Sequence, residues 1–461
     1  MTVHPTDLEF PGGFPTPATV SAAYDDADFV RAVQCYKHFF PLVSGASIFA
    51  GQEAVGVRVN EVFGYMDTHP AQVGLTLNSD TPYGGPLLDL HVGPLVAEIP
   101  PGPIVGAILN YDQSWITDVG IPGRDAGKGG AYLLLPPGYD GEIPGGYFPA
   151  QARSFKILVG LRGIPKNGDV AAAIELLKTV VIRPLDPALS WQEPTWIDMS
   201  GDPQDTSPGP VQGTERFWEL LHQAMQDEPA RDGDGVAEGD LAVLGIRRGQ
   251  PFEPDERMHA ILESAARTAD AHMRVQSLAD RRPDRVAWPD RQWEWVSLRP
   301  DNVFFETDGY SDVTARETWF YRAIASSPAM FGRVPGGGSV YWFDAHDSDG
   351  AYLDGARDYT LKIPSPIPAG LFWSVTVYDA ITRSQIDAGP GRAALRSLFE
   401  LADAAEGKDI ELRFGPEDPG DESAYWVKTI PGRGWFVYLR LYGPTARAFD
   451  GSWKPGDFTI Q

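Results

Sequence analysis

Short apolar runs, each bounded by polar turn residues, recur along two long stretches of the chain, and this pattern predicts β-strands. In the first stretch the expected strands are 73–77, 87–91, 95–99, 105–109, 132–135 and 156–161. In the second stretch they are 340–345, 359–363, 373–378, 410–414 and 435–441. Turn signals such as Pro-Pro-Gly and Asp-Gly separate the strands. Spacing of this kind is typical of a sandwich or jelly roll.

Apolar residues at helical spacing predict helices outside these stretches. One helix is expected at 25–40, and two more are expected at 214–226 and 254–280. A further helix is expected from Thr314, because Thr314 and Glu317 match a capping box. Polar segments rich in Gly, Pro and Asp lie at 200–213 and 227–239, where connectors are expected.

These elements divide the chain into four parts. The parts are an N-terminal arm at 1–24, a β-rich module with flanking helices at 25–200, a helical connector at 201–335, and a C-terminal β-sandwich module at 336–461. The sequence therefore predicts an α+β protein that is mainly β, with two β-sandwich or jelly-roll-like modules and a helical segment between them. A length of 461 residues agrees, because it exceeds what one ordinary core accommodates.

The amino-acid composition excludes some classes of binding partner and predicts a cellular location. The formal net charge of −25 repels phosphate backbones and anionic lipids, so we expect neither nucleic-acid nor membrane binding. The single cysteine, Cys35, allows no intramolecular disulfide and is expected to be buried. No signal peptide or long apolar span is found in the sequence, so a cytoplasmic location is expected. The many aromatic residues favour a homo-oligomer.

Familiar catalytic signatures are missing from the sequence, which has no GxSxG elbow, P-loop, HExxH motif or paired CxxC. No cofactor is therefore predicted. Asp347 and Asp349, with His346, resemble half of a calcium loop, although the register of an EF-hand is not kept. A turn between strands is the first interpretation, and a divalent cation at Asp347 and Asp349 is the second.

The most informative polar cluster is Asn78-Ser-Asp-Thr-Pro-Tyr, directly after an apolar run. Burial of Asp80 among leucines would raise its pKa toward the range of a general base. Tyr83 could donate a hydrogen bond to a developing oxyanion. The alternative is a tight turn in which Asn78 and Asp80 bind backbone amides.

Two further tyrosine–aspartate pairs, Tyr111-Asp112 and Tyr378-Asp379, follow predicted strands. The three pairs together could line one cleft, while capping of strand ends would explain each pair alone. Arg322 and Arg440 interrupt apolar runs, so each needs a carboxylate partner or would anchor an anionic substrate. The catalytic candidates are Asp80, Tyr83, Asp112 and Asp379. The substrate-binding candidates are Asn78, Thr81, Tyr111, Trp115, Arg322, Tyr378 and Arg440, and no metal ligands are predicted.

Several sequence blocks resemble a bacterial family of paired domains of unknown function, DUF1254 followed by DUF1214. The N-terminal blocks are NSDTPYGGPLLDL at 78–90 and AGKGGAYLLLPPGYDGEIPGG at 126–146. The C-terminal blocks are GIRRGQPF at 245–252, DSDGAYLDGARDYTL at 347–361, FWSVTVYD at 372–379 and LRLYGP at 439–444. Where the family pattern is Asn-Arg-Asp-Thr-Leu-Tyr, this chain has Ser79 and Pro82 in place of Arg and Leu. The resemblance implies β-sandwich modules with helices and carries over no catalytic residue.

Three functions fit these observations. The first is a small-molecule enzyme with hydrolase or lyase acid–base chemistry in a cleft between the two β modules. The second is a non-catalytic jelly-roll protein that binds a glycan or another small ligand on aromatic side chains. The third is a structural or assembly protein. An enzyme would place Asp80 in a pocket within reach of the second module, whereas a structural role would leave all three aspartates occupied by backbone amides or arginines.

Overall fold

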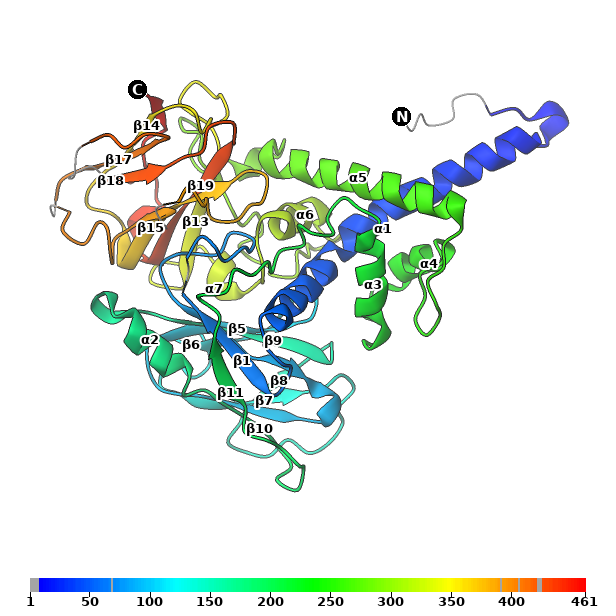
Figure 1. Cartoon of the computed structure of the whole chain (residues 1–461), viewed down its shortest axis with the longest axis horizontal. Helices are drawn as coiled ribbons and strands as arrows, with labels where there is room; N and C mark the ends of the chain where they lie inside the picture. Colours follow the sequence, from blue (N-terminus) through cyan, green and yellow to red (C-terminus); the bar gives the residue numbers. More distant parts are fainter. Residues whose placement is uncertain (1–7, 68, 390–391, 405–406, 421–424) are drawn as a thin grey trace.

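A computed structural model describes residues 8–67, 69–389, 392–404, 407–420 and 425–461. The chain forms two β modules, one above the other, with a group of helices beside them (Figure 1). The α+β class expected from the sequence is confirmed, while a jelly-roll strand order is not. Among the described residues, no helix combines the length and apolar character that a membrane crossing requires.

The N-terminal module contains two sheets that share one apolar core. The larger one, here called the N-terminal inner sheet, has the order β11-β1-β2-β9-β5-β6, and β3 also pairs with β9. The smaller one has the order β10-β4-β7-β8. The strands are β1 (Val62–Met66), β2 (Tyr83–Gly85), β3 (Leu87–Asp89), β4 (Leu95–Ile99), β5 (Ile104–Asn110), β6 (Trp115–Gly120), β7 (Gly130–Leu135), β8 (Phe148–Gln151), β9 (Lys156–Gly163), β10 (Val181–Pro184) and β11 (Thr195–Asp198).

The C-terminal module repeats this arrangement with a second pair of sheets around a second core. Its C-terminal inner sheet has the order β12-β13-β19-β15-β16, and its outer sheet has the order β18-β17-β14-β20. The strands are β12 (Glu294–Trp295), β13 (Ser339–Asp344), β14 (Tyr359–Ile363), β15 (Ala369–Asp379), β16 (Ala394–Arg396), β17 (Ile410–Gly415), β18 (Tyr425–Lys428), β19 (Trp435–Pro444) and β20 (Thr459–Ile460).

Helices form a third core that contacts both modules. They are α1 (Pro17–Ala54), α2 (Val170–Leu177), α3 (Arg216–Gln226), α4 (Gly235–Val243), α5 (Glu256–Leu278), α6 (Val313–Arg322) and α7 (Pro328–Phe331). Short 3-10 turns lie at Pro11–Gly13, Leu90–Val92, Lys166–Gly168, Pro283–Arg285 and Ala446–Ala448. The C-terminal half of α1 is buried on nearly all sides, as expected for a helix that crosses a core.

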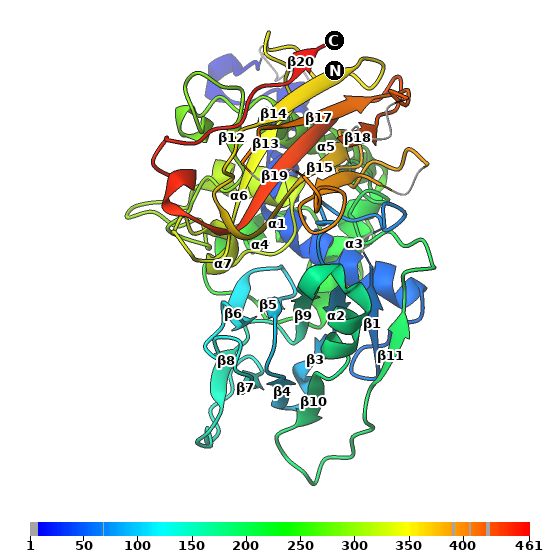
Figure 2. The same ribbon diagram turned by 90° about the vertical axis from the view of Figure 1, so that its left-hand side faces the viewer.

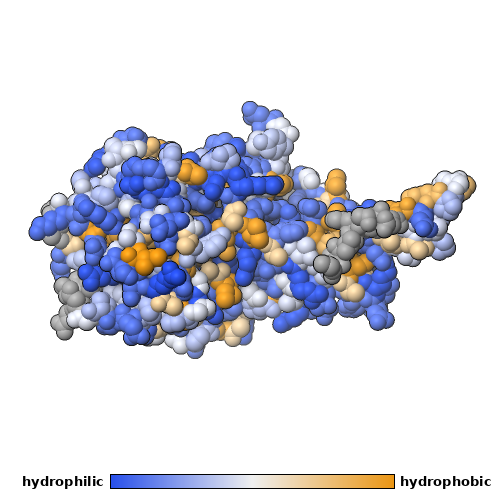
Figure 3. Space-filling model, turned by 90° about the horizontal axis from the view of Figure 1, so that it is seen from above, coloured by the Kyte–Doolittle hydropathy of each residue, from blue (hydrophilic) through white to orange (hydrophobic). Residues whose placement is uncertain are grey.

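The N-terminal end of α1 projects from the body, and hydrophobic side chains gather on it (Figure 3). Phe14 and Tyr24 are among the most exposed large hydrophobic residues there, at 77% and 65%. The helix starts at Pro17, so it includes part of the stretch expected to be an arm.

Three further local predictions differ from the structure. Segment 73–77 is not a strand, because Thr76 has a positive φ of 43° and its N–H bonds to the carbonyl of Arg383 in the other module. Helix α4 begins at Gly235, inside the expected connector. Helix α6 is capped by Asp312, whose side chain accepts the N–H of Ala315, so the capping box at Thr314 is wrong.

Candidate functional site

A cavity of about 330 Å³ lies between the two modules. Strands β2, β5 and β9 of the N-terminal inner sheet form its floor, and β13 and β19 of the C-terminal inner sheet form its roof. Figure 2 shows β5 and β9 below, and β13 and β19 above, the region where the modules meet. Helix α1, segment 75–78 and the segment after α6 close the sides.

The floor follows from the alternation of side chains along β9. Ile157, Val159 and Leu161 point into the N-terminal core, so the residues between them face the other way, into the cavity. These cavity-facing residues of β9 pair across the sheet with residues of β5, and the pairs are Leu158 with Leu109, Gly160 with Ala107, and Arg162 with Val105. The middle of the floor is therefore made of small residues, and one end carries a guanidinium.

The roof follows the same rule on β19. Leu439 and Leu441 point into the C-terminal core, whereas Tyr438, Arg440 and Tyr442 face the cavity. In the neighbouring strands, Arg440 is paired with Tyr341 on one side and with Ser374 on the other. The roof is therefore an aromatic and polar surface rather than a second apolar core.

Arg162 and Arg440 bring positive charge to the cavity from opposite sheets. Nη1 of Arg162 donates to the hydroxyl of Tyr442 at 3.4 Å, and Nη2 of Arg440 donates to the carbonyl of Thr76 at 2.8 Å. The guanidinium of Arg440 also lies 4.9 Å from the ring centre of Tyr438. Neither arginine forms an ion pair with a carboxylate of the described residues.

Asp80 lies behind the cavity wall and joins the two modules. It is 1% exposed, and its Oδ2 accepts a hydrogen bond of 2.8 Å from Ser374 of β15. Its Oδ1 is buried without a hydrogen-bond partner among the described residues. Burial raises the pKa of Asp80, while the Ser374 hydroxyl and the Arg440 charge partly offset this effect. The predicted reach to the second module is present, although Asn78 and Tyr83, not Asp80, line the cavity.

Asn78, Thr81 and Tyr83 form a hydrogen-bonded turn beside Asp80. Oδ1 of Asn78 accepts the N–H groups of Asp80 and Thr81, at 2.9 and 3.2 Å. The Asn78 side-chain amide donates to the Tyr83 hydroxyl at 2.8 Å, and its backbone N–H donates to the same oxygen at 3.3 Å. The segment therefore forms the expected tight turn and also places Asn78 and Tyr83 in the cavity wall. Thr81 is buried and does not line the cavity.

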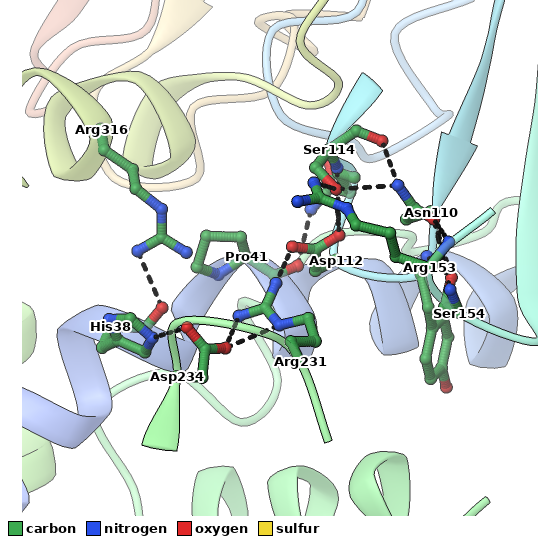
Figure 4. Close-up of polar contacts among 12 residues, drawn as sticks. His38, Pro41, Asn110, Asp112, Ser114, Arg153, Ser154, Arg231, Asp234 and Arg316 are labelled. Carbon is green, nitrogen blue, oxygen red and sulfur yellow. Dashed lines mark hydrogen bonds and ion pairs between the residues drawn. The ribbon is translucent and has the colours of Figure 1, made fainter. Parts of the chain in front are cut away.

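Tyr111 and Asp112 belong to a different site, at the junction with the helices. Figure 4 shows Asp112 facing Arg231, which also pairs with Asp234, and Asp234 in turn contacts His38. Burial alone would raise the pKa of Asp112, but the Arg231 charge and the Ser114 hydroxyl hold it below its ordinary value. Asp112 is therefore held as a carboxylate by an internal ion pair.

Trp115 also lies outside the cavity lining. Its indole N–H donates to Oδ1 of Asp118 at 3.3 Å, and burial raises the pKa of Asp118 to about 6.

The next three candidates, Tyr378, Asp379 and Arg322, make contacts inside the protein. Asp379 pairs with Arg433 at 2.7 Å and accepts the N–H groups of Ile381 and Thr382, which closes the turn after β15. The Tyr378 hydroxyl donates to the carbonyl of Leu77 at 2.7 Å. The guanidinium of Arg322 is 4.2 Å from the ring centre of Phe343. The structure therefore brings Asn78, Tyr83 and Arg440 to one cavity. Tyr378 packs behind the cavity wall, with its ring centre 5.4 Å from the Arg440 guanidinium, whereas Asp379 and the Tyr111–Asp112 pair lie away from the cavity.

Four residues of this region were not predicted from the sequence: Arg162, Tyr341, Ser374 and Tyr442. One sequence pattern could have indicated them: polar residues at every second position of a strand whose other side chains enter an apolar core. The expected strand 156–161 stops one residue before Arg162, which hid that signal.

The loop at Asp347 and Asp349 forms a tight turn, in which Oδ1 of Asp347 accepts the N–H groups of Asp349 and Ala351 at 3.0 Å. No group of three or more metal-ligating side chains is found in the part of the chain that the structure describes. A cation at this loop stays a prediction.

Comparisons with known proteins extend over most of the chain. Residues 60–184 match the model described as Protein of unknown function (DUF1254), and residues 338–446 match Protein of unknown function (DUF1214). A search of curated proteins gives no match.

Two solved structures align along nearly the whole chain. The VPA0106 protein from Vibrio parahaemolyticus is 16% identical, with a TM-score of 0.56, and the alignment covers 94% of this chain and 100% of that one. An uncharacterised protein from Burkholderia cenocepacia is 10% identical, with a TM-score of 0.39 and coverage of 96% and 98%. The first likeness shows a shared fold.

Proposed function

The chain belongs to the family in which DUF1254 is followed by DUF1214, and from the cavity between these two domains we propose that it binds a small, largely apolar molecule. The floor strands β2, β5 and β9 lie within the DUF1254 match, and the roof strands β13 and β19 lie within the DUF1214 match. The proposed site is thus assembled only when both domains are present.

The observation that carries this proposal is the open space above Gly160. Packed interiors fill such positions with side chains. A Cβ atom added at Gly160 would meet only the carbonyl oxygen of Ala107, at 3.7 Å, so the neighbouring atoms leave room for a larger group. A volume of about 330 Å³ is at the lower end of the range for small-molecule sites.

Most of the wall is apolar, which favours a ligand with an apolar body. The apolar lining includes Leu77, Leu109, Leu158, Met199 and Met330. A glycan fits this lining less well, because sugar hydroxyls need more polar partners than such walls offer.

Gly160→Leu provides a direct test, because the new side chain would occupy the cavity from its floor. The neutral fluorophore phenylnaphthylamine should bind the unaltered protein and should bind Gly160→Leu at least about tenfold more weakly. Gly160→Ala, which adds one methyl group, is the matched control and should retain most of the binding. Equal binding to all three folded proteins would refute the proposal.

An acid–base enzyme of the hydrolase or lyase type is the second candidate, favoured by the buried Asp80 carboxyl beside Tyr83. A ligand that co-purifies with the protein can be identified by mass spectrometry and incubated with the protein. If Asp80 is a general base, Asp80→Asn should bind the ligand but convert it at least about a hundredfold more slowly. Equal conversion by Asp80→Asn would exclude this role.

A further inference from the structure

Arg162 and Arg440 come from different modules and line the same end of the cavity. Arg440 and Tyr442 are two positions apart on β19 and lie on the same face, which puts their Cα atoms about 7 Å apart. Arg162 reaches up from the floor to the Tyr442 hydroxyl. Both guanidiniums are close enough to Tyr83, Asp80 and Tyr442 to lower the pKa of each against the opposing effect of burial.

This end of the cavity has more hydrogen-bond donors than acceptors. Arg440 is 4% exposed, and its Nη1 has no partner among the described residues. The Tyr83 oxygen accepts two hydrogen bonds from Asn78, so its own proton is left to donate, and none of the described residues accepts it. Burial raises the pKa of Tyr83 and of Tyr442, so both hydroxyls keep their protons near neutral pH.

Positive charge at this end is not balanced by the cavity wall. Among the described residues, no Asp or Glu lines the cavity. The carboxyl group of Asp80 lies behind the cavity wall, where it accepts a hydrogen bond from Ser374. Two guanidiniums therefore face at most one carboxylate. An unpaired buried charge is costly, and a ligand that supplied one negative charge would remove that cost. This local excess contrasts with the net charge of −25 of the whole chain.

From this geometry we infer that the ligand is an apolar monocarboxylic acid, with its carboxylate between Arg162 and Arg440 and its body along the apolar floor. Two guanidinium groups and a phenol supply the donors that a carboxylate accepts. A single carboxylate would offset part of the positive charge that the two guanidiniums bring to this end of the cavity. The inference rests on the proposed function, since it names the ligand class of the same cavity.

Isothermal titration calorimetry of the full-length protein with octanoate, octanol and octyl phosphate tests the inference. Octanoate should bind at least about tenfold more tightly than octanol, because only octanoate can pair with the arginines. Octyl phosphate should bind no more tightly than octanoate. A tenfold preference for octyl phosphate would overturn the carboxylate assignment, and equal binding of octanoate and octanol would overturn the anionic group altogether.

Arginine variants test whether Arg162 and Arg440 cause the preference for octanoate over octanol. Arg162→Gln and Arg440→Gln should each weaken octanoate binding by about tenfold or more and leave octanol within about threefold. Arg413→Gln, on β17 of the outer sheet, is the matched control and should change neither ligand. If both glutamine variants weaken octanol as much as octanoate, the arginines do not bind an anion. Should Arg440→Gln not fold after losing its bond to Thr76, Arg162→Gln decides, because its side chain bonds only to Tyr442 in the described chain.

Gly160→Leu separates this inference from the proposed function. If octanoate and octanol bind equally and Gly160→Leu abolishes both, the cavity is a binding site and the inferred carboxylate is wrong. If none of the three ligands binds, the inference fails, and phenylnaphthylamine binding decides the proposed function. If Gly160→Leu leaves the binding of these ligands and of phenylnaphthylamine unchanged, the proposed function and the inference both fail.

Discussion

At the scale of single residues, three aspartates in similar sequence contexts have different surroundings. Asp112 and Asp379 each pair with an arginine, and each has a pKa below its ordinary value despite burial. Asp80 receives one hydroxyl bond and no ion pair, and burial raises its pKa. The direction of the pKa shift depends on whether an arginine from a distant part of the sequence forms an ion pair with the aspartate. Arg231 and Arg433 do so for Asp112 and Asp379.

The ion pair between Asp112 and Arg231 should matter for stability. Asp112→Ala would leave Arg231 with only Asp234 and is expected to lower the free energy of unfolding by about 2–3 kcal/mol, because a buried charge loses a partner. Urea denaturation provides the measurement. Asp409→Asn, which breaks an exposed pair with Lys362, is the control and should leave the urea midpoint unchanged. Equal midpoints for Asp112→Ala and the unaltered protein would contradict the proposed importance of this pair.

The site residues were only partly predictable at this scale. The Asn78–Tyr83 cluster was recognised because unusual polar residues directly follow an apolar run, which is a local signal. No local sequence pattern determines whether the three tyrosine–aspartate pairs converge, because convergence depends on the order of strands within the sheets. Arg162 gives no local signal of a site, because a single arginine at the end of an apolar strand has the pattern of an ordinary strand terminus.

At the scale of elements, apolar runs bounded by turn signals were predicted best. Strands β4 and β14 have the predicted bounds, and β5, β9, β13 and β17 differ from them by one or two residues at either end. Segment 73–77 has the same apolar pattern but is not a strand. Its residues 75–77 are buried between the two modules, and the N–H of Thr76 bonds to Arg383 of the C-terminal module. The parallel pairing of β1 with β11 joins residues far apart in sequence, and no local pattern encodes such pairing.

The start of α6 offers a test of capping. Asp312 accepts the N–H of Ala315 and also pairs with Arg282 at 2.6 Å. Asp312→Ala should lower the free energy of unfolding by about 1–2 kcal/mol, because it removes the cap. Thr314→Ala is the comparison, because it removes the hydroxyl that bonds to Arg282 and Asp312 but leaves the backbone cap in place, and a smaller cost of about 0.5 kcal/mol is expected. Thermal or urea unfolding of both variants gives the comparison, and a larger cost for Thr314→Ala would restore the capping box.

At the scale of the whole molecule, the cavity results from two sheets that each use one face for a core and the other face for the partner module. The sequence encodes the two faces of each strand, and the α+β class follows from them. It does not encode locally which faces meet, so the cavity and the pairing of Arg162 with the roof became visible only in the folded chain.

The whole molecule should also be more stable in mild acid than in mild alkali. Glu228 accepts the N–H groups of Phe155 and Lys156 at 2.7 and 2.9 Å, and burial raises its pKa to about 7. A carboxyl whose pKa is higher in the folded state contributes stability below its unfolded pKa, near 4.5, and this contribution is lost as the pH rises through about 7. Asp118, with a pKa of about 6, acts in the same direction.

The high net negative charge complicates this test, because self-repulsion also falls as carboxylates are protonated. The contribution of Glu228 is therefore read from a variant rather than from the pH profile alone. Glu228→Gln should reduce the difference in unfolding free energy between pH 5 and pH 8 by roughly 2–3 kcal/mol. Glu142→Gln removes an equal charge from an exposed loop and controls for net charge. An equal reduction in both variants would assign the pH dependence to overall repulsion and not to the buried carboxyl that joins the helices to β9.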